Sequence, residues 1–459
     1  MAVNGCPICL EKQRRIDELE EEVKGLQAKL RYQERREQDG YFGSSTPSSK
    51  RPVKANSEAA EKKSKGARLG HKGVGRRSHK EGSADRMVEV EAESEICPEC
   101  GALLEKKGWA ERSVVDTLTQ KPEKVTFRLA KRYCPHCRRN VTVQAPGVLP
   151  KSLYGNQLIA AAIEMHFLHG MPMGRISEHL GIGAGSLLKL LNRSARLFEG
   201  VPDRLIDEYR RSAVKHADET GWRTDGKNGY VWLFATPYLS VFQFGKNRSA
   251  KVPQAVFGKS PLPGTLVVDR YAGYNKAPCQ IQYCYAHLLR EVEDLEKEFF
   301  GEAEVSTFVA VVAPLLSLAI GLRRQPITDL EFYRRAATLR DEIRAVMNQP
   351  AKHMGIRRIQ DIFRQNEPRL FHWADNREVP ADNNLAERDL RPSVIARKVS
   401  FGSVTDAGAH VRSTLTTLVT TLKKRGQNVP GRIKQALDLL AKNPEADLFA
   451  FMFPKPNPP

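Results

Sequence analysis

The chain has 459 residues, and its 73 Lys and Arg against 54 Asp and Glu give a formal net charge of +19. This length allows roughly two to four domains, and an apolar fraction of 41% permits a core beneath a largely polar surface. So large a positive excess indicates a polyanionic partner, most simply nucleic acid; a basic enzyme with a diffuse electrostatic field is the alternative.

The apolar pattern does not predict a membrane or secreted protein. The stretch Val309–Leu322 is shorter than the roughly 20 apolar residues of a membrane span, and we interpret it as a buried helix. The N-terminus, Met1–Cys6, has no apolar signal region. We therefore expect a cytoplasmic, nucleoid-associated protein. Thiols stay reduced in that compartment, so close cysteine pairs indicate metal ligands before disulfides.

Residues 1–42 predict a helical or coiled-coil segment. Apolar residues alternate three and four apart along a short heptad seam, at Ile16, Leu19, Val23, Leu26 and Leu30. Two heptads are marginal alone, so the segment either self-associates or packs on its own chain.

Residues 43–88 predict a basic flexible linker, because they are rich in Ser, Gly, Pro and Lys and poor in large apolar side chains. Between residues 50 and 86 there are twelve Lys or Arg and four Asp or Glu. We expect Lys72, Arg76 and Arg77 to contact DNA phosphates without sequence preference. A solvated linker is the alternative.

Residues 89–150 predict a zinc ribbon. Two tight knuckles each offer two thiolates, at Cys97, Cys100, Cys134 and Cys137. Four thiolates suit tetrahedral Zn²⁺, and the strand-like segments 112–118 and 124–133 lie between the knuckles. A third knuckle, formed by Cys6 and Cys9, has no partner in the sequence. It could pair with the same knuckle of a second chain.

Residues 151–211 predict a helical, helix-turn-helix-like region. An apolar helix near 159–168 precedes two helical segments, 174–180 and 186–191, which a glycine-rich turn separates. The polar face of the last segment carries Lys189 and Arg193, which we expect to contact DNA. An ordinary helical hairpin that braces the rest of the chain is the alternative.

Residues 212–300 predict the first part of an α/β core. Strand patterns near 214–217, 230–235 and 239–244 precede a helix at 249–257. The apolar run 265–268 then predicts a strand buried on both faces, and a strand at 282–285 leads into a helix from about Ala286. Three meander strands, a helix and two further strands are the order of a ribonuclease-H-like domain.

Three acidic residues mark a candidate catalytic centre in this core. Asp218 follows the first strand and Asp269 the buried run, so both would lie on adjacent central strands. Residues 301–378 predict a helical insertion, after which residues 379–446 complete the core with a helix that presents Glu387. Asn383 and Asn384 would lie on the same face of this helix and orient a metal-bound carboxylate or water. Three such carboxylates could hold two divalent ions, which clamp the oxygens of a phosphodiester.

The predicted fold class is multidomain α+β, closed by a C-terminal tail at residues 447–459. Several ordered blocks then resemble the DDE transposases of the insertion sequence 66 family. The blocks are Asp218–Thr220, Asp269–Tyr274, Cys284–His287, Asp382–Arg388, Arg397–Lys398 and Phe401–Ser403. The cysteine knuckles and the Gly70–Gly73 linker are similar to that family's N-terminal segments. Two departures are Val399–Ser400, where members often carry Asn-Trp-Leu, and the short tail.

The resemblance implies that Asp218, Asp269 and Glu387 bind Mg²⁺ or Mn²⁺. It places His287 near the scissile phosphate, or as an orienting residue, unless it is a helix-start histidine satisfied by its neighbours. We expect four cations after Glu387 to contact DNA: Arg388, Arg391, Arg397 and Lys398. The implied activity is cleavage of element ends and strand transfer into target DNA, by a homo-oligomer on DNA, with possible accessory proteins from the element. A nuclease without strand transfer and a non-catalytic DNA-binding descendant are the rivals.

Overall fold

The computed structural model describes residues 145–454 without a gap, the short strands at 131–134 and 139–142, residues 122 and 127, and some helical residues between Arg15 and Gln27. Contacts divide the chain into two units, and the second, Ser48–Lys121, lies outside the described residues. Several predicted site residues also lie outside them: Cys6, Cys9, Lys72, Arg76, Arg77, Cys97, Cys100 and Cys137.

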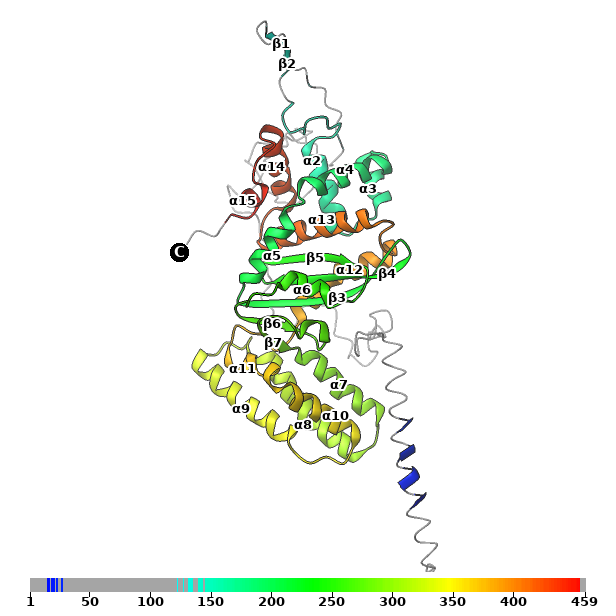
Figure 1. Ribbon diagram of the computed structural model, residues 1–459, viewed down its shortest axis with the longest axis vertical. Coiled ribbons are helices and arrows are strands. Elements are labelled where there is room, and N and C mark those ends of the chain that lie inside the picture. The colour runs from blue at the N-terminus through cyan, green and yellow to red at the C-terminus, as the bar shows by residue number, and fades with distance from the viewer. Residues whose placement is uncertain are drawn as a thin grey trace, which may run out of the picture. The chain divides into compact units, whose positions relative to one another are not determined.

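A five-stranded mixed sheet forms the centre of the described residues (Figure 1). Its strands are β3 Val214–Thr224, β4 Lys227–Thr236, β5 Leu239–Gly245, β6 Thr265–Val268 and β7 Gln280–Tyr283. Their spatial order is β5-β4-β3-β6-β7, with β3 to β5 antiparallel and β6 and β7 parallel to β3. The five predicted strands are therefore confirmed. β7 ends two residues earlier than predicted, because Cys284 is already the N-cap of the next helix.

Two glycine positions set how the central strands meet. Asp225 and Gly226 both have positive φ, at 55° and 69°, and form the two-residue turn that joins β3 to β4. Gly264 precedes β6 with φ at 72°, and a Cβ there would lie 1.9 Å from the carbonyl oxygen of Ala213. This close approach lets Thr265 N–H donate to the same carbonyl at 2.8 Å, which starts the parallel pairing of β6 with β3.

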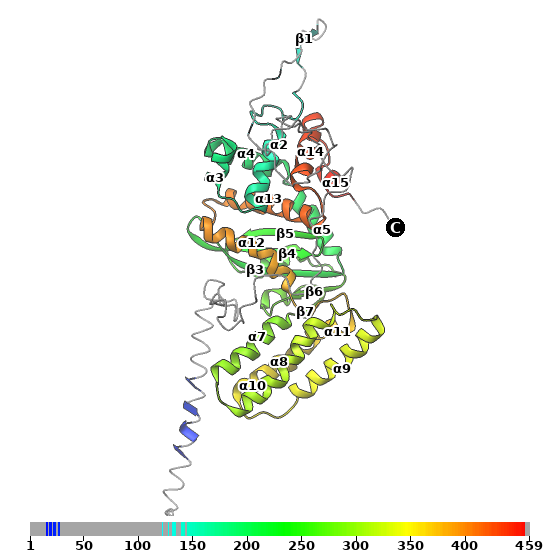
Figure 2. The same ribbon diagram turned by 180° about the vertical axis from the view of Figure 1, so that it is seen from behind.

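Helices cover both faces of the sheet (Figures 1 and 2). The helix α6, Lys251–Phe257, lies on one face, and α12, Asn384–Ser400, crosses β3 and β4 on the other. The helix α13, Asp406–Lys424, follows the edge strand β5. There the hydroxyl oxygens of Thr417 and Thr421 accept from Phe242 N–H and Ser240 N–H. These contacts satisfy backbone groups that an open sheet edge would expose.

A helical layer beside α13 combines segments from both ends of the described range. It contains α2 Asn156–Ile163, η1 Glu164–Leu168, α3 Met173–Leu180, α4 Ala184–Leu197, α5 Val201–Arg211, α14 Val429–Lys442 and α15 Leu448–Met452. Gly181, with φ at 61°, ends α3 in the left-handed conformation, so the predicted helix–glycine turn–helix geometry is confirmed. The predicted tail contains α15.

The predicted regular helix near 159–168 is wrong over its last five residues, which form a π-helix. There His166 Nδ1–H donates to the carbonyl oxygen of Met171 at 2.9 Å, and its Nε2 accepts from Arg412 at 3.0 Å. Burial, and then the charge of Arg412, lower the pKa of His166 to about 4. The ring is therefore neutral near pH 7 and links η1 to α13.

The predicted insertion is helical and lies beyond β7 (Figure 1). After α7, Tyr285–Glu298, it contains α8 Ala303–Leu322, α9 Asp329–Met347, α10 Met354–Asn366, η3 Glu367–Arg369 and α11 His372–Asp375. The prediction that the apolar run is too short for a span is wrong. Within the described residues α8 is long and apolar enough, by length and composition, to cross a membrane, because the helix extends back to Ala303 with Glu304 as its one charged residue. It packs between α7 and α9.

Two short strands, β1 Lys131–Cys134 and β2 Arg139–Thr142, form an antiparallel pair. Cys134 pairs with Arg139, so the strands flank the second cysteine knuckle, as a zinc ribbon requires. Near the N-terminus, the described helical residues leave four seam side chains about half exposed: Ile16, Leu19, Val23 and Leu26. The zinc site and the coiled coil stay predictions.

Candidate active site

The sheet brings two of the predicted acids to one level. His216 on β3 pairs with Val267 on β6 in parallel register. Two residues further along each strand stand Asp218 and Asp269. Both side chains are half-buried, and each accepts a backbone N–H close to its own position, from Glu219 and Tyr271, at 2.9 Å. The prediction that these acids lie on adjacent central strands is confirmed.

The N-terminus of α12 is tied to β3 by Asn383. This residue is fully buried and precedes the helix as its N-cap. Its amide oxygen accepts from His216 Nδ1–H at 2.9 Å, and its amide nitrogen donates to the carbonyl oxygen of Ala217 at 2.9 Å. The sequence suggested that this amide orients a metal-bound carboxylate or water. Instead, its oxygen and its nitrogen both bind groups of β3. It fixes Glu387, four residues later, relative to the strand that carries Asp218.

A buried thiol joins a third element to the same junction. Cys284, the N-cap of α7, accepts the backbone N–H of Asn383 at 3.1 Å. The backbone N–H of the next residue, Tyr285, donates to the carbonyl oxygen of Ala381 at 2.8 Å. Burial raises the pKa of the Cys284 thiol to about 12, so the sulfur is protonated at neutral pH. The N-termini of α7 and α12 are thus joined by hydrogen bonds to each other and, through Asn383, to β3.

The electrostatics of Asp218 show that the acids converge. Burial raises the pKa of Asp218 well above its ordinary value, and the negative charges of Glu219, Asp269 and Glu387 raise it further. A carboxylate whose pKa is raised by neighbouring carboxylates is stabilised in its charged form by a bound cation. Such a group is arranged for cations, and its all-oxygen donors suit Mg²⁺ or Mn²⁺.

Glu387 lies next to two nitrogen-bearing side chains of α7, those of Arg290 and His287. Arg290 Nη2 lies 3.1 Å and 3.2 Å from its two carboxylate oxygens. His287 Nδ1 lies 3.9 Å from Oε1, and this buried nitrogen has no hydrogen-bond partner among the described residues. Burial, and then the charge of Arg290, lower the pKa of His287. A neutral ring with an unsatisfied nitrogen beside a carboxylate fits a position that a ligand completes.

A second ion pair lies on the other face of β3, at Glu219. Its side chain is fully buried and accepts from Arg248 Nε at 2.6 Å and from the hydroxyl of Tyr274. Arg248 lies 4.1 Å above the ring of Tyr271 and its Nη2 is 4.0 Å from Asp269 Oδ2. Burial, and then the charge of Asp269, raise the pKa of Glu219 to about 7 even beside this arginine. Arg248 therefore bridges Glu219 and Asp269 from behind the site.

Within the described residues, Cys284, His287 and Glu387 form a group whose ligand atoms lie within 4.8 Å of one another. A divalent ion could be held here if the thiol of Cys284 gave up its proton. The geometry thus offers carboxylates on β3, directly after β6 and on α12. His287 and Arg290 of α7 lie next to the carboxylate of α12, Glu387.

Comparison with known proteins identifies the family of the chain. The family model described as Transposase IS66 family matches residues 151–411, which is more than half of the chain. The chain belongs to this family. An uncharacterized protein of Sinorhizobium fredii, y4qI, is 23% identical over 352 residues, which are 68% of this chain and 65% of that protein. The chain therefore spans just under two thirds of the length of that relative.

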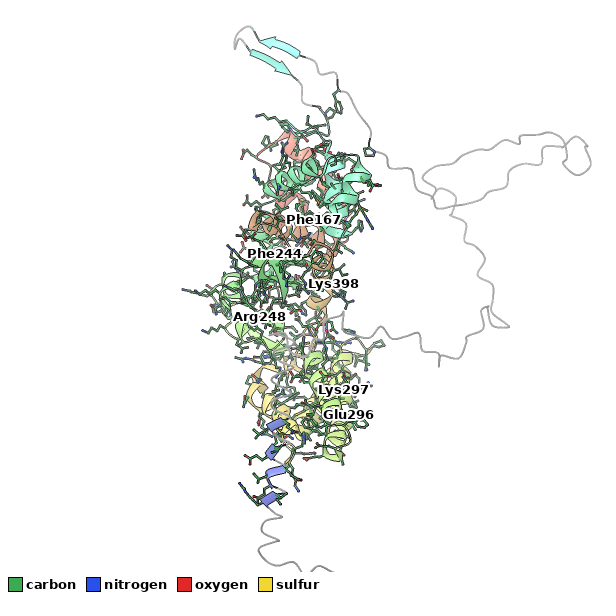
Figure 3. The ribbon with its side chains drawn as sticks, turned by 90° about the vertical axis from the view of Figure 1, so that its right-hand side faces the viewer. Phe167, Phe244, Arg248, Glu296, Lys297 and Lys398 are labelled. Atoms are coloured by element: carbon green, nitrogen blue, oxygen red, sulfur yellow. The ribbon has the colours of Figure 1, made fainter. Side chains whose placement is uncertain are left out.

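In this IS66-family chain, the residues predicted to contact DNA differ in their surroundings. Lys189 and three cations of α12, Arg388, Arg391 and Lys398, are exposed. Arg193 is exposed too, but its Nη2 donates to the carbonyl oxygen of Pro150 at 2.6 Å. In Figure 3, Lys398, Phe244 and Arg248 lie at the level of the sheet. DNA contact by these cations stays a prediction.

Arg397 has a structural role that the sequence did not predict. Its guanidinium is half-buried and donates to the carbonyl oxygen of Gly221 on β3. Burial, and then the charge of Arg223, lower its pKa. α12 therefore ends on β3 through Arg397, as it begins on β3 through Asn383. One turn later Phe401 is 77% exposed in the left-handed region, at φ of 58°, which is uncommon for a bulky residue.

Three site residues were missed by the sequence argument: Glu219, Arg248 and Arg290. Glu219 had only its place beside Asp218 as a signal, and Arg248 had none. Arg290 follows His287 by three residues on a predicted helix, so it could have been assigned to the same face.

Proposed function

We propose that this IS66-family chain is a DDE transposase, which cleaves the ends of an insertion sequence and joins them to target DNA. The observation that carries the proposal is how the sheet places the acids: the register of β3 and β6 sets Asp218 beside Asp269, and Asn383 ties the helix of Glu387 to β3. The negative charges of Asp269 and Glu387 accordingly raise the pKa of Asp218. A protein with a net charge of +19 places three acids together where phosphate chemistry needs cations. The sheet order β5-β4-β3-β6-β7 supports a ribonuclease-H-like catalytic domain.

In the proposed site, Asp218 would be shared by two Mg²⁺ or Mn²⁺ ions, and Asp269 and Glu387 would each complete one. Bound divalent ions supply Lewis acidity at the attacking and leaving oxygens of a phosphodiester. The side chains of the protein hold the three acids in place. Asn383 and Arg397 hold α12 against β3, and Arg248 holds the side of Asp269. Neutral His287 is placed to accept a proton or to bind a phosphate oxygen beside Glu387.

The DNA would lie along exposed cations of α12, which neutralise backbone charge without reading bases. The N-terminal parts of the proposal rest on sequence. Zn²⁺ at the four ribbon cysteines would order the domain whose second knuckle β1 and β2 flank. The half-exposed seam near the N-terminus fits self-association on DNA.

Single substitutions of the acids test the proposal. Asp218→Asn, Asp269→Asn and Glu387→Gln should each abolish Mg²⁺-dependent nicking and joining of element ends, while binding to those ends persists. Asp225→Asn is a matched control, because Asp225 lies in the exposed turn at the other end of β3. Cleavage by any correctly folded acid variant would refute the assignment. Joined products from a 3′-hydroxyl donor would distinguish a transposase from a nuclease of the same fold.

A further inference from the structure

We propose that Arg290 exchanges partners during the reaction: it neutralises Glu387 before the divalent ion binds, and it contacts a DNA phosphate once the ion has taken Glu387. The inference rests on the proposed function. It adds to the three acids a catalytic residue that the family match and the sequence motifs do not assign.

In its contact with Glu387, the guanidinium of Arg290 takes the position that a divalent ion would take. Arginine commonly binds a carboxylate through two nitrogens, one for each oxygen. Here the single nitrogen Nη2 stands nearly equidistant from both oxygens, at 3.1 Å and 3.2 Å. A cation placed symmetrically before a carboxylate occupies the region in which a divalent ion would bind. Arg290 and the ion therefore cannot both hold Glu387 in this way.

The remaining donors of Arg290 are available for a second partner. Nε and Nη1 make no hydrogen bond with any residue that the structure describes. The side chains of Arg290 and Glu387 keep 22% and 29% of their surface exposed, so solvent and a ligand can reach them. A guanidinium whose N–H groups are unused and accessible, next to a proposed phosphodiester site, matches the geometry of a phosphate oxygen pair.

Arg248 shows what a fixed arginine looks like in the same site. Its side chain is only 6% exposed, pairs with the fully buried Glu219, and stacks on Tyr271. Arg290 has neither a buried carboxylate partner nor an aromatic platform among the described residues. It stands on the same face of α7 as His287, one turn later. When a divalent ion occupies Glu387, repulsion between like charges moves the guanidinium, and the flexible side chain can follow.

The exchange predicts that Arg290→Gln binds Mn²⁺ more tightly and yet cleaves DNA more slowly. Arg290→Gln removes the competitor for Glu387, so metal-free protein should bind Mn²⁺ more tightly, by about 3- to 10-fold, the value of a partly exposed ion pair. The same variant loses its phosphate contact, so kcat for end cleavage at saturating Mn²⁺ should fall by about 100-fold. A merely structural role would not tighten metal binding while slowing turnover.

The experiment uses the full chain and titrates Mn²⁺ by calorimetry or electron paramagnetic resonance without DNA. Glu387→Gln gives the background from other sites. Arg358→Gln is the matched control, because Arg358 pairs with the α7 residue Glu291 at 3.8 Å and is 40% exposed; it should match wild type in both measurements. Unchanged or weaker Mn²⁺ binding by folded Arg290→Gln, or an unchanged kcat, would overturn the proposal.

The two proposals fail in different ways. If wild-type protein binds Mn²⁺ through Glu387 but cleaves no element end, the transposase proposal fails. The Mn²⁺ titration of Arg290→Gln then still decides whether Arg290 and the ion compete. If wild-type protein cleaves DNA but Arg290→Gln cleaves equally fast, only the role of Arg290 is lost. Arg290→Lys, which keeps the charge but not the planar fork, should lie between wild type and Arg290→Gln in kcat.

Discussion

Asn383→Ala should destabilise the protein and loosen its active site together. The substitution removes two hydrogen bonds of 2.9 Å and leaves His216 Nδ1 and the carbonyl oxygen of Ala217 without partners. Both groups are buried, and each unsatisfied polar group costs about 1–3 kcal/mol. We expect the free energy of unfolding to fall by about 2–5 kcal/mol. Because Asn383 sets the start of α12, Mn²⁺ binding should weaken as well.

Urea unfolding followed by tryptophan fluorescence measures the first effect, since Trp222, Trp232 and Trp373 are buried in the described core. Asn384→Ala is the control one residue away. Its half-buried side chain makes no hydrogen bond in the described part of the chain, so the change should stay within about 0.5 kcal/mol. Equal midpoints for the Asn383 and Asn384 variants would refute the reasoning.

Three further outcomes follow from buried or strained groups. Because the pKa of His166 is about 4, the unfolded chain binds its proton first, and the unfolding free energy should fall as pH drops from 6.5 to 4, by at most about 3 kcal/mol. His166→Gln should lower this slope in urea titrations across that range, and the slope that remains should include the contribution of His216, whose pKa burial also lowers to about 4. Arg248→Met or Glu219→Gln alone should each cost about 3–5 kcal/mol by leaving a buried charge, and the double variant much less, as a double-mutant cycle would show. Gly264→Ala should cost about 2 kcal/mol or more, since its Cβ would strike backbone. Gly170→Ala, also at positive φ but with open space, should cost less; equal losses in thermal unfolding would contradict the clash.

The sheet could be predicted because its strands carry local signals. Thr265–Val268 is a short apolar run between Gly264 and Asp269, and its bounds match the prediction. The π-helix η1 could not be predicted in the same way, because a hydrogen bond from His169 N–H to the carbonyl oxygen of Glu164 leaves no distinct side-chain period. α8 was predicted too short, since its first turn mixes polar and small residues before the apolar run.

The acids of the site were easier to predict than the residues around them. Asp269 directly follows β6, and Asp218 lies within β3, which runs on to Thr224 beyond the predicted end at residue 217. The apolar strand patterns therefore still placed the two acids side by side. The pair of Glu219 and Arg248 depends on how a loop folds over the sheet, which no spacing in the sequence records. Asn383 was singled out but given the wrong partner, because the predicted helix began too early.

The hydrogen bond from Tyr285 to Ala381 has a consequence for how this chain could diversify. The chain leaves the core at the start of α7 and returns to the same place before α12. When an inserted segment begins and ends at one place, the entropic cost of closing it grows only slowly with the length of the segment. Its length and content can therefore change between relatives without displacing Glu387. The helices α8 to α11 form a module that evolution, or a protein engineer, could shorten or replace while the reacting groups keep their places.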